Sequence, residues 1–303
     1  MGFAYPKQKF QDWFTQQWAI FWGTRIDPRA VPWLVGPLGS LGVIADHFVE
    51  KVAEQEGLVV ERNATGQGLI PSMKELQLPG AEFARLSPAI VDFYEKTSLY
   101  RLAFRVQWNP LFKVFGKLVN YLFSHRIGQL NIPSNRAESS EQITSEIITL
   151  TDPGTGKVKY TVWYRTFKST GQVLYSGVYS TCTLPSGEVC VKAVFPLPNG
   201  NATVILSPSV GPEGGLRLAS SGKKFGAPGF YFLLKDANGK LWSQYVRSFR
   251  DQLDVRYHEG HLMAEQTLTL WHWRVLRFQY TIHLAGQEAA ASISPKLDRE
   301  GLG

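Results

Sequence analysis

Cysteine is nearly absent from this sequence, which has only two cysteines in 303 residues. Such a low count excludes a disulfide-stapled scaffold and is typical of a reducing compartment. No run of about 18 uninterrupted apolar residues occurs, and the N-terminal segment lacks the apolar centre of a signal peptide. We therefore expect a cytoplasmic protein without a membrane-spanning helix. Cys182 and Cys190 flank an expected turn and are predicted to be two small buried thiols.

Motifs that identify common enzyme classes are also missing. No GxSxG elbow, no HExxH helix and no P-loop occurs, so the sequence predicts no catalytic residue and implies no cofactor. The run HEGH at 258–261 holds two histidines and a carboxylate, but its glycine indicates a turn. We interpret this run as a hairpin tip and predict no metal site.

A glycine-rich run at 36–42, GPLGSLG, comes nearest to a nucleotide-binding motif. It lies between a short apolar segment, 31–35, and an expected helix over Val43–Glu56. That order resembles the dinucleotide-binding fingerprint of Rossmann folds. Leu38 stands where the fingerprint needs a glycine, and no further βα units follow. We therefore expect an ordinary loop that leads into a helix.

Acidic residues are missing from the interval 96–137, which carries seven Lys and Arg residues and so matches the net charge of +7. Within it, Leu111–Ile127 has apolar residues at helical spacing and lysines on its other faces. Such a helix either packs on the protein core or lies on an anionic membrane surface. Nucleic acid is disfavoured as a partner, because no reader motif accompanies the charge. The candidate membrane-surface residues are Lys113, Lys117, Phe115 and Phe123.

Two more helices are predicted in the first half of the chain. Lys7–Trp22 places several aromatic residues on one face. This stripe is interpreted as docking on the β region, with a membrane interface as the alternative. Ser87 followed by Pro88 is typical of a helix start, and a proline at position 110 indicates the end, so a helix is expected up to about Trp108.

The second half of the chain, from about Ser145 to Leu284, reads as a series of short strands. Lys157–Thr166 alternates strictly between two faces, the pattern of a half-buried strand. Turns rich in Gly, Pro, Asn and Asp separate roughly nine or ten such segments. Short connections make neighbouring strands antiparallel, and a large antiparallel sheet tends to close on itself.

These patterns predict an α+β protein built around a large antiparallel β-barrel of the lipocalin or calycin kind. A β-sandwich is the second choice. The expected divisions are an N-terminal helical region that packs on the barrel (1–143), the barrel itself (144–285) and a mobile tail (286–303).

Arginine on apolar strand faces indicates where a ligand site is expected. His272 and Arg274 continue an apolar face if their strand stays regular, and Arg247 lies between two aromatic residues. A buried arginine needs an anionic partner, either a carboxylate of the chain such as Asp251 or one from a ligand. An apolar barrel with one or two arginines resembles the way fatty-acid-binding proteins hold a carboxylate head group. The predicted ligand-binding residues are Arg247, Arg274, His272, Trp163 and Tyr245.

The predicted function is the binding of a hydrophobic, anionic small molecule, such as a lipid, a fatty-acid-like or a polyketide-like compound, in a β-barrel cavity. One alternative is a cofactor-independent isomerase or cyclase that acts on a lipophilic substrate in the same cavity, because shape and one general acid leave no motif. Another is a protein peripheral to an anionic membrane.

Overall fold

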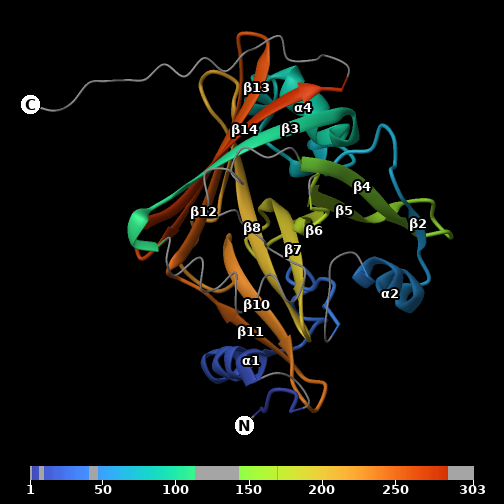
Figure 1. The fold of residues 1–303 in the computed structure, drawn as a ribbon, viewed down its shortest axis with the longest axis vertical. Coiled ribbons are helices and arrows are strands. Elements are labelled where there is room, and N and C mark those ends of the chain that lie inside the picture. Colours follow the sequence, from blue (N-terminus) through green and yellow to red (C-terminus); the bar gives the residue numbers. More distant parts are fainter. Residues whose placement is uncertain (1, 7–9, 41–46, 113–142, 169, 286–303) are drawn as a thin grey trace, which may run out of the picture.

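The structure is a computed structural model that describes residues 2–6, 10–40, 47–112, 143–168 and 170–285. Antiparallel strands dominate these residues, and short helices lie in the first hundred (Figure 1). The helices are α1 (Phe10–Trp22), α2 (His47–Glu56), α3 (Gly80–Phe83) and α4 (Pro88–Glu95), with 3-10 turns η1 (Met73–Leu76) and η2 (Thr97–Leu99). The strands are β1 (Thr24–Ile26), β2 (Val59–Glu61), β3 (Tyr100–Trp108), β4 (Ile143–Thr151), β5 (Val158–Phe167), β6 (Val173–Thr183), β7 (Val189–Leu197), β8 (Gly200–Val210), β9 (Leu216–Ala219), β10 (Gly229–Lys235), β11 (Leu241–Tyr245), β12 (Phe249–His258), β13 (His261–Leu270) and β14 (Trp273–Leu284).

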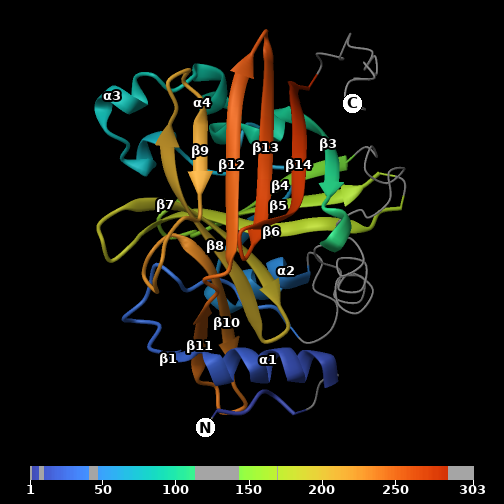
Figure 2. The same ribbon diagram turned by 90° about the vertical axis from the view of Figure 1, so that its left-hand side faces the viewer.

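The described strands form one sheet that forks at β8. Its longest hydrogen-bonded path runs β2-β4-β5-β6-β7-β8-β9-β12-β13-β14-β3. One edge of β8 pairs with β7. Along its other edge, the first part of β8 pairs with β10 and the last part with β9. Strands β10, β11 and β1 therefore leave in one direction, and β9 with β12–β14 in the other (Figure 2).

The longer branch curls around the main hydrophobic core. Tyr175 of β6 and Phe278 of β14, which lie far apart along the path, meet with ring centroids 6.2 Å apart. Strand β3, at one end of the path, and β4, next to the other end, contribute Phe104 and Ile147 to the same core. Within the described residues, however, no backbone pairing joins β3 to β4, and part of the free edge of β4 pairs with β2. The antiparallel, β-rich class is therefore confirmed, whereas closure into a barrel is not.

Two helices cover other parts of the sheet. Helix α2 packs Phe48 and Val52 on the outer face of β4–β7, where they meet Ile148 and Val162. Helix α1 lies on the β10–β11 hairpin at one end of the molecule (Figures 1 and 2). The inner face of the curled branch packs in a separate core, which neither of these two helices joins.

The docked face of α1 differs from the expected one. The helix itself matches the prediction closely, but its buried side chains are Gln16, Ala19 and Ile20. Of the aromatic stripe, Trp13 packs against this cluster, whereas other members face outward, with Phe14 57% and Phe21 63% exposed. The helix therefore docks on the β region as expected, but only part of its aromatic stripe makes the contact.

The N-terminal region is less helical than predicted. Helix α4 ends at Glu95, and the segment Tyr100–Trp108, expected as its continuation, is strand β3 paired with β14. Its residues alternate between buried and exposed along the strand, a period of two that the capping signal at Pro88 had obscured. Strands β1 and β2 also come from this region and pair within the same sheet.

The predictions for the two cysteines and for the run 258–261 are supported, whereas one predicted helix lies outside the described residues. Cys182 and Cys190 are opposite each other in the β6–β7 pair and are both buried free thiols. The run 258–261 forms the tight turn between β12 and β13, as expected for a hairpin tip. The predicted helix Leu111–Ile127, including Lys113, Lys117, Phe115 and Phe123, lies almost entirely outside the described residues.

Candidate functional site

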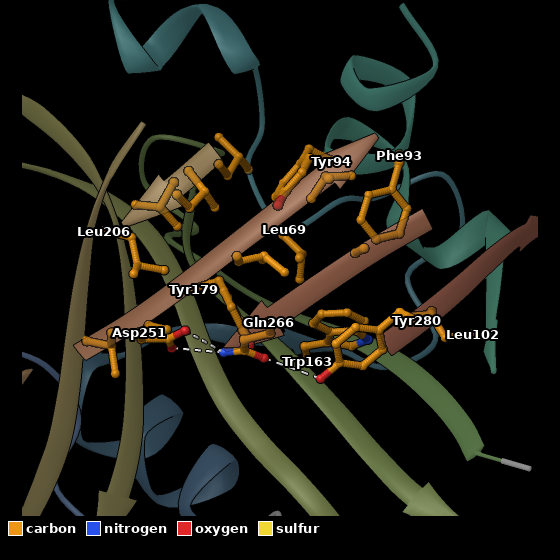
Figure 3. Close-up of a pocket in the computed structure, with 18 of the residues that line it drawn as sticks. Leu69, Phe93, Tyr94, Leu102, Trp163, Tyr179, Leu206, Asp251, Gln266 and Tyr280 are labelled. Atoms are coloured by element: carbon orange, nitrogen blue, oxygen red, sulfur yellow. Dashed lines mark hydrogen bonds between the residues drawn. The ribbon is translucent and has the colours of Figure 1, made fainter. Parts of the chain in front are cut away.

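An interior cavity of about 90 Å³ lies within the curled branch, between the inner faces of its strands and helix α4 (Figure 3). Its wall is mostly apolar, with Phe93 from α4, Leu102 from β3 and Leu206 from β8 among the lining residues. The volume is several times what one water molecule needs. The polar or amphipathic side chains in the wall are Tyr94, Trp163, Arg165, Tyr179, Asp251, Gln266 and Tyr280.

Strand β5 carries the one arginine that lines this cavity. Trp163 and Arg165 are two positions apart and therefore point to the same, inner face of the sheet. Their neighbours Val162 and Tyr164 point to the outer face, toward the cluster formed with α2. Arg165 is only 5% exposed, although its strand lies close to the free edge of the sheet.

Arg165 has aromatic neighbours but lacks a counter-ion. Its guanidinium carbon lies 4.0 Å from the ring centroid of Trp163 and 4.8 Å from that of Tyr175, its cross-strand partner on β6. Its buried Nε has no hydrogen-bond partner, and among the described residues no carboxylate lies within ion-pair distance of it. Stacking on aromatic rings recovers only part of the free energy lost when a guanidinium leaves water.

A row of three polar side chains, Asp251, Gln266 and Tyr280, crosses the cavity (Figure 3). Gln266 Nε2 donates to both carboxylate oxygens of Asp251, at 3.0 and 2.8 Å, and the Tyr280 hydroxyl donates to Gln266 Oε1 at 3.3 Å. Burial raises the pKa of Tyr280, and the nearby Arg165 opposes this rise by its charge and by hydrogen bonding. The row therefore links β12, β13 and β14 to β5 on the facing wall.

Asp251 is the titratable group of this row. Its backbone N–H donates to Ser220 Oγ at 2.6 Å, and the Ser220 N–H donates to its carbonyl at 2.8 Å. Burial raises the pKa of the Asp251 carboxyl to about 7, although the hydrogen bonds from Gln266 act in the lowering direction. Asp251 therefore changes its charge near neutral pH, inside the cavity.

The wall beside Arg165 is preformed. Trp163 Nε1 donates to Ser145 Oγ of β4 at 2.6 Å, which fixes the ring against which the guanidinium stacks. Gly177 lies opposite Trp163 on β6, and a Cβ there would stand 2.8 Å from the Phe195 ring, another cavity residue. A site whose walls are already in place loses less conformational entropy when it binds a ligand.

Of the five predicted ligand residues, the structure places Trp163 at the cavity. Tyr245 packs against a separate apolar cluster that includes Tyr231 and Leu233 of β10, and its hydroxyl donates to the Gly222 carbonyl at 2.7 Å. Arg247 and His272 instead line a hollow on the surface.

Arg274 and His272 do not continue an apolar strand face. Strand β13 ends at Leu270, and Trp271 and His272 form its turn with φ angles of 47° and 73°. The assumption of a regular strand through these positions is therefore wrong, because the backbone reverses there. Arg274 is the second residue of β14 and is exposed.

The sequence reasoning missed both charged residues that line the cavity, Arg165 and Asp251. Arg165 shares the alternating face of Trp163 in Lys157–Thr166, so the same pattern that selected the tryptophan contained it. Asp251 alternates with Leu253 and Val255, which also line the cavity. The sequence analysis considered Asp251 only as an ion-pair partner of an arginine. Its raised pKa results from burial, which cannot be inferred from the sequence pattern.

The described residues hold neither a metal-binding cluster nor a membrane-spanning helix. In the part of the chain that the structure describes, no group of three or more His, Cys, Asp or Glu side chains is arranged to hold a metal ion. None of the helices in the described ranges has the length and apolarity needed to span a membrane.

Among curated proteins, the chain is similar to one called "Uncharacterized membrane protein YndJ" from Bacillus subtilis (strain 168). The two are 28% identical over 160 residues, which is 52% of this chain. The matched part is 28% of the length of that relative, so this chain corresponds to only a portion of it. No family model matches the chain, and no solved structure does.

Proposed function

We propose that this protein binds a small anionic amphiphile, such as a fatty acid, with the head group at Arg165 inside the curled sheet. The observation that carries the proposal is the buried guanidinium of Arg165, which lines a mostly apolar cavity and, among the described residues, has no carboxylate within ion-pair distance. An anion that binds there supplies the missing counter-charge, so its binding relieves a cost already present in the empty protein.

The cavity chemistry narrows the class of ligand. A carboxylate or phosphate head group matches the planar fork of an arginine, and an apolar tail matches the aliphatic and aromatic wall. The modest volume favours a short acid, or the head end of a longer chain, over a bulky polycyclic compound. The name of the Bacillus relative, a membrane protein, supports a lipidic setting for such a ligand.

The proposal is tested by titrating the protein with decanoate and with decanol, its uncharged match. Decanoate is expected to bind and to raise the melting temperature, whereas decanol has little effect. The Arg165→Gln variant is expected to lose about a hundredfold in decanoate affinity, because charge-assisted hydrogen bonds contribute about 1.5–3 kcal/mol.

Arg101→Gln is the matched control, since Arg101 is an exposed arginine on the neighbouring part of the same sheet. It should leave decanoate affinity unchanged. Equal binding of the acid and the alcohol, or equal loss in both variants, would contradict a head-group site at Arg165. Mass spectrometry of an organic extract of the purified protein identifies the ligand carried from the cell.

A second candidate function, cofactor-independent catalysis on a lipophilic substrate, is favoured by Asp251. This carboxyl faces the cavity with a pKa raised to about 7 by burial, which suits a general acid or base at neutral pH. If the protein is an enzyme, Asp251→Asn should keep its affinity for the extracted compound but no longer convert it. If the protein is a carrier, the native protein should leave the extracted compound chemically unchanged.

A further inference from the structure

The turn between β13 and β14 presents two tryptophans to solvent. Trp271 is 66% exposed and Trp273 is 60% exposed. Leu111, 75% exposed, extends this apolar surface, because Asn109 two residues earlier donates its side-chain amide to the Arg274 carbonyl at 2.9 Å. The β13–β14 tip, defined as 270–275 with the adjoining segments 246–250 and 108–112, therefore combines exposed apolar groups from two parts of the chain, 270–275 and 108–112.

Positive charge accompanies these apolar groups. The three segments contain three arginines and one histidine but no Asp or Glu. Arg247, Arg250 and His272 line a surface hollow together with Ser248 and Trp271. Several donors around one hollow, with no carboxylate in these segments to neutralise them, form a surface complementary to a phosphate group.

The backbone of the tip is held in an unfavourable conformation. Trp271 and His272 both have positive φ, a region that bulky residues avoid and that two-residue turns normally fill with Asn and Gly. The Trp271 N–H donates to the Ser248 carbonyl at 2.9 Å, which fixes the turn against the hollow. Strain of this kind at an exposed turn indicates that the side chains serve a purpose other than folding.

We propose that the β13–β14 tip docks on the surface of membranes that contain anionic phospholipids. Lipid phosphates occupy the hollow between Arg247, Arg250 and His272. Trp271 and Trp273 lie in the interfacial layer of the bilayer, where tryptophan is favoured, and Leu111 reaches the acyl region. This docking is separate from ligand binding at Arg165 and does not depend on it.

A lipid surface fits the observations better than nucleic acid, which also carries phosphates. Exposed Trp and Leu side chains gain free energy by entering hydrocarbon, whereas an exposed leucine contributes little to a nucleic-acid contact. Figure 2 shows α1 and the connection between β13 and β14 on the side of the molecule that faces the viewer. Trp18 and Phe21 of α1 are also exposed aromatic side chains.

Co-sedimentation with vesicles tests the proposal. The native protein is expected to bind vesicles of phosphatidylcholine and phosphatidylserine at low salt and to bind pure phosphatidylcholine much more weakly. Arg247→Gln with Arg274→Gln should reduce the partition coefficient about thirtyfold, since each basic residue near an anionic surface contributes roughly a factor of five. Trp271→Ala with Trp273→Ala should reduce it about tenfold and abolish quenching of tryptophan fluorescence by brominated lipids.

The opposite end of the same hairpins provides the controls. Arg256→Gln and Tyr257→Ala change exposed residues on β12, next to its turn with β13, and should leave vesicle binding unchanged. Arg165→Met should also bind vesicles normally, which separates this proposal from the cavity site. Absence of native protein from the anionic vesicle pellet, equal effects of tip and control variants, or binding to a DNA or RNA duplex in place of vesicles would overturn the proposal.

Discussion

Arginine occurs in two contrasting settings in this molecule. Arg165 lies inside the curled sheet between aromatic rings, whereas Arg247 and Arg274 are exposed at the β13–β14 tip. A buried guanidinium has lost its hydration and needs a counter-charge, while an exposed one keeps its water and attracts partners through a field that salt screens. The same residue type therefore indicates a ligand in one place and a surface in the other, and burial decides which.

The largest effect on folding stability is expected from the buried carboxyl group of Asp251. Its pKa is raised from 3.8 to about 7 by burial, so the folded protein binds more protons than the unfolded chain between these values. Stability should therefore fall as the pH rises through this window, by an amount on the order of 4 kcal/mol. Asp251→Asn should remove most of this slope, as measured by urea unfolding across the same pH range. Asp254→Asn, a partly exposed carboxylate nearby, should keep it.

The next largest effect on folding stability is expected from Arg165, which has no carboxylate within ion-pair distance among the described residues. Arg165→Met should stabilise the ligand-free protein by about 2 kcal/mol, because it removes a buried charge that no carboxylate compensates. The exposed Arg105→Met should change the free energy of unfolding by less than about 0.5 kcal/mol. Denaturant midpoints of the two variants measure this contrast. A destabilised Arg165→Met protein would mean that the aromatic contacts satisfy the cation without a ligand.

The two turns that bound β13 allow a test of the strained tip. Trp271→Asn with His272→Gly should stabilise the fold by about 1–2 kcal/mol, since it installs the residues that this turn prefers. The turn at Glu259 and Gly260 already has glycine at its second position, so Glu259→Asn should have a smaller effect. Thermal unfolding compares them. A loss of stability in the double variant would show that Trp271 and His272 serve folding.

The smallest effect on stability is expected when the two exposed arginines of the β13–β14 tip are replaced. Arg247→Gln with Arg274→Gln should change the free energy of unfolding by less than about 0.5 kcal/mol, because exposed charges contribute little to stability. Decanoate affinity should also stay constant, since neither residue lines the cavity. A marked loss of decanoate affinity would show that the tip arginines influence the cavity site, so the two sites would not be independent.

Much of the strand pattern was predictable because period-two alternation is a local property. The hairpins from β5 to β8 and the β12–β13 hairpin lie close to where turn residues and alternating faces placed them, whereas the turn between β13 and β14 was expected near Arg274 and lies at Trp271 and His272. Strand β3 was missed because a good helix start at Pro88 precedes it, and only pairing with β14 shows that the segment from Tyr100 is extended. Whether the sheet closes also depends on contacts between distant strands, which no local pattern contains.

The candidate site was predictable only in part. Alternation identified Trp163, and the search for arginine on an apolar face was the correct principle. It selected Arg274 and His272 because the turn at Trp271 has none of the usual turn residues, so the strand was expected to continue. The importance of Arg165 and Asp251 follows from burial in a cavity whose walls come from strands far apart in the sequence, which the tertiary fold alone supplies.

Strand β8 connects the two branches of the sheet, and this has a consequence for cooperativity. Its first half is held between β7 and β10, and its last residues pair with β9. A shift of β8 by one residue would turn Val204 and Leu206 away from the cavity and break the pairing of both branches at once. The branch that carries the cavity and the branch that carries α1 should therefore unfold in a single transition, with the amides of Gly200–Ile205 among the slowest to exchange with solvent.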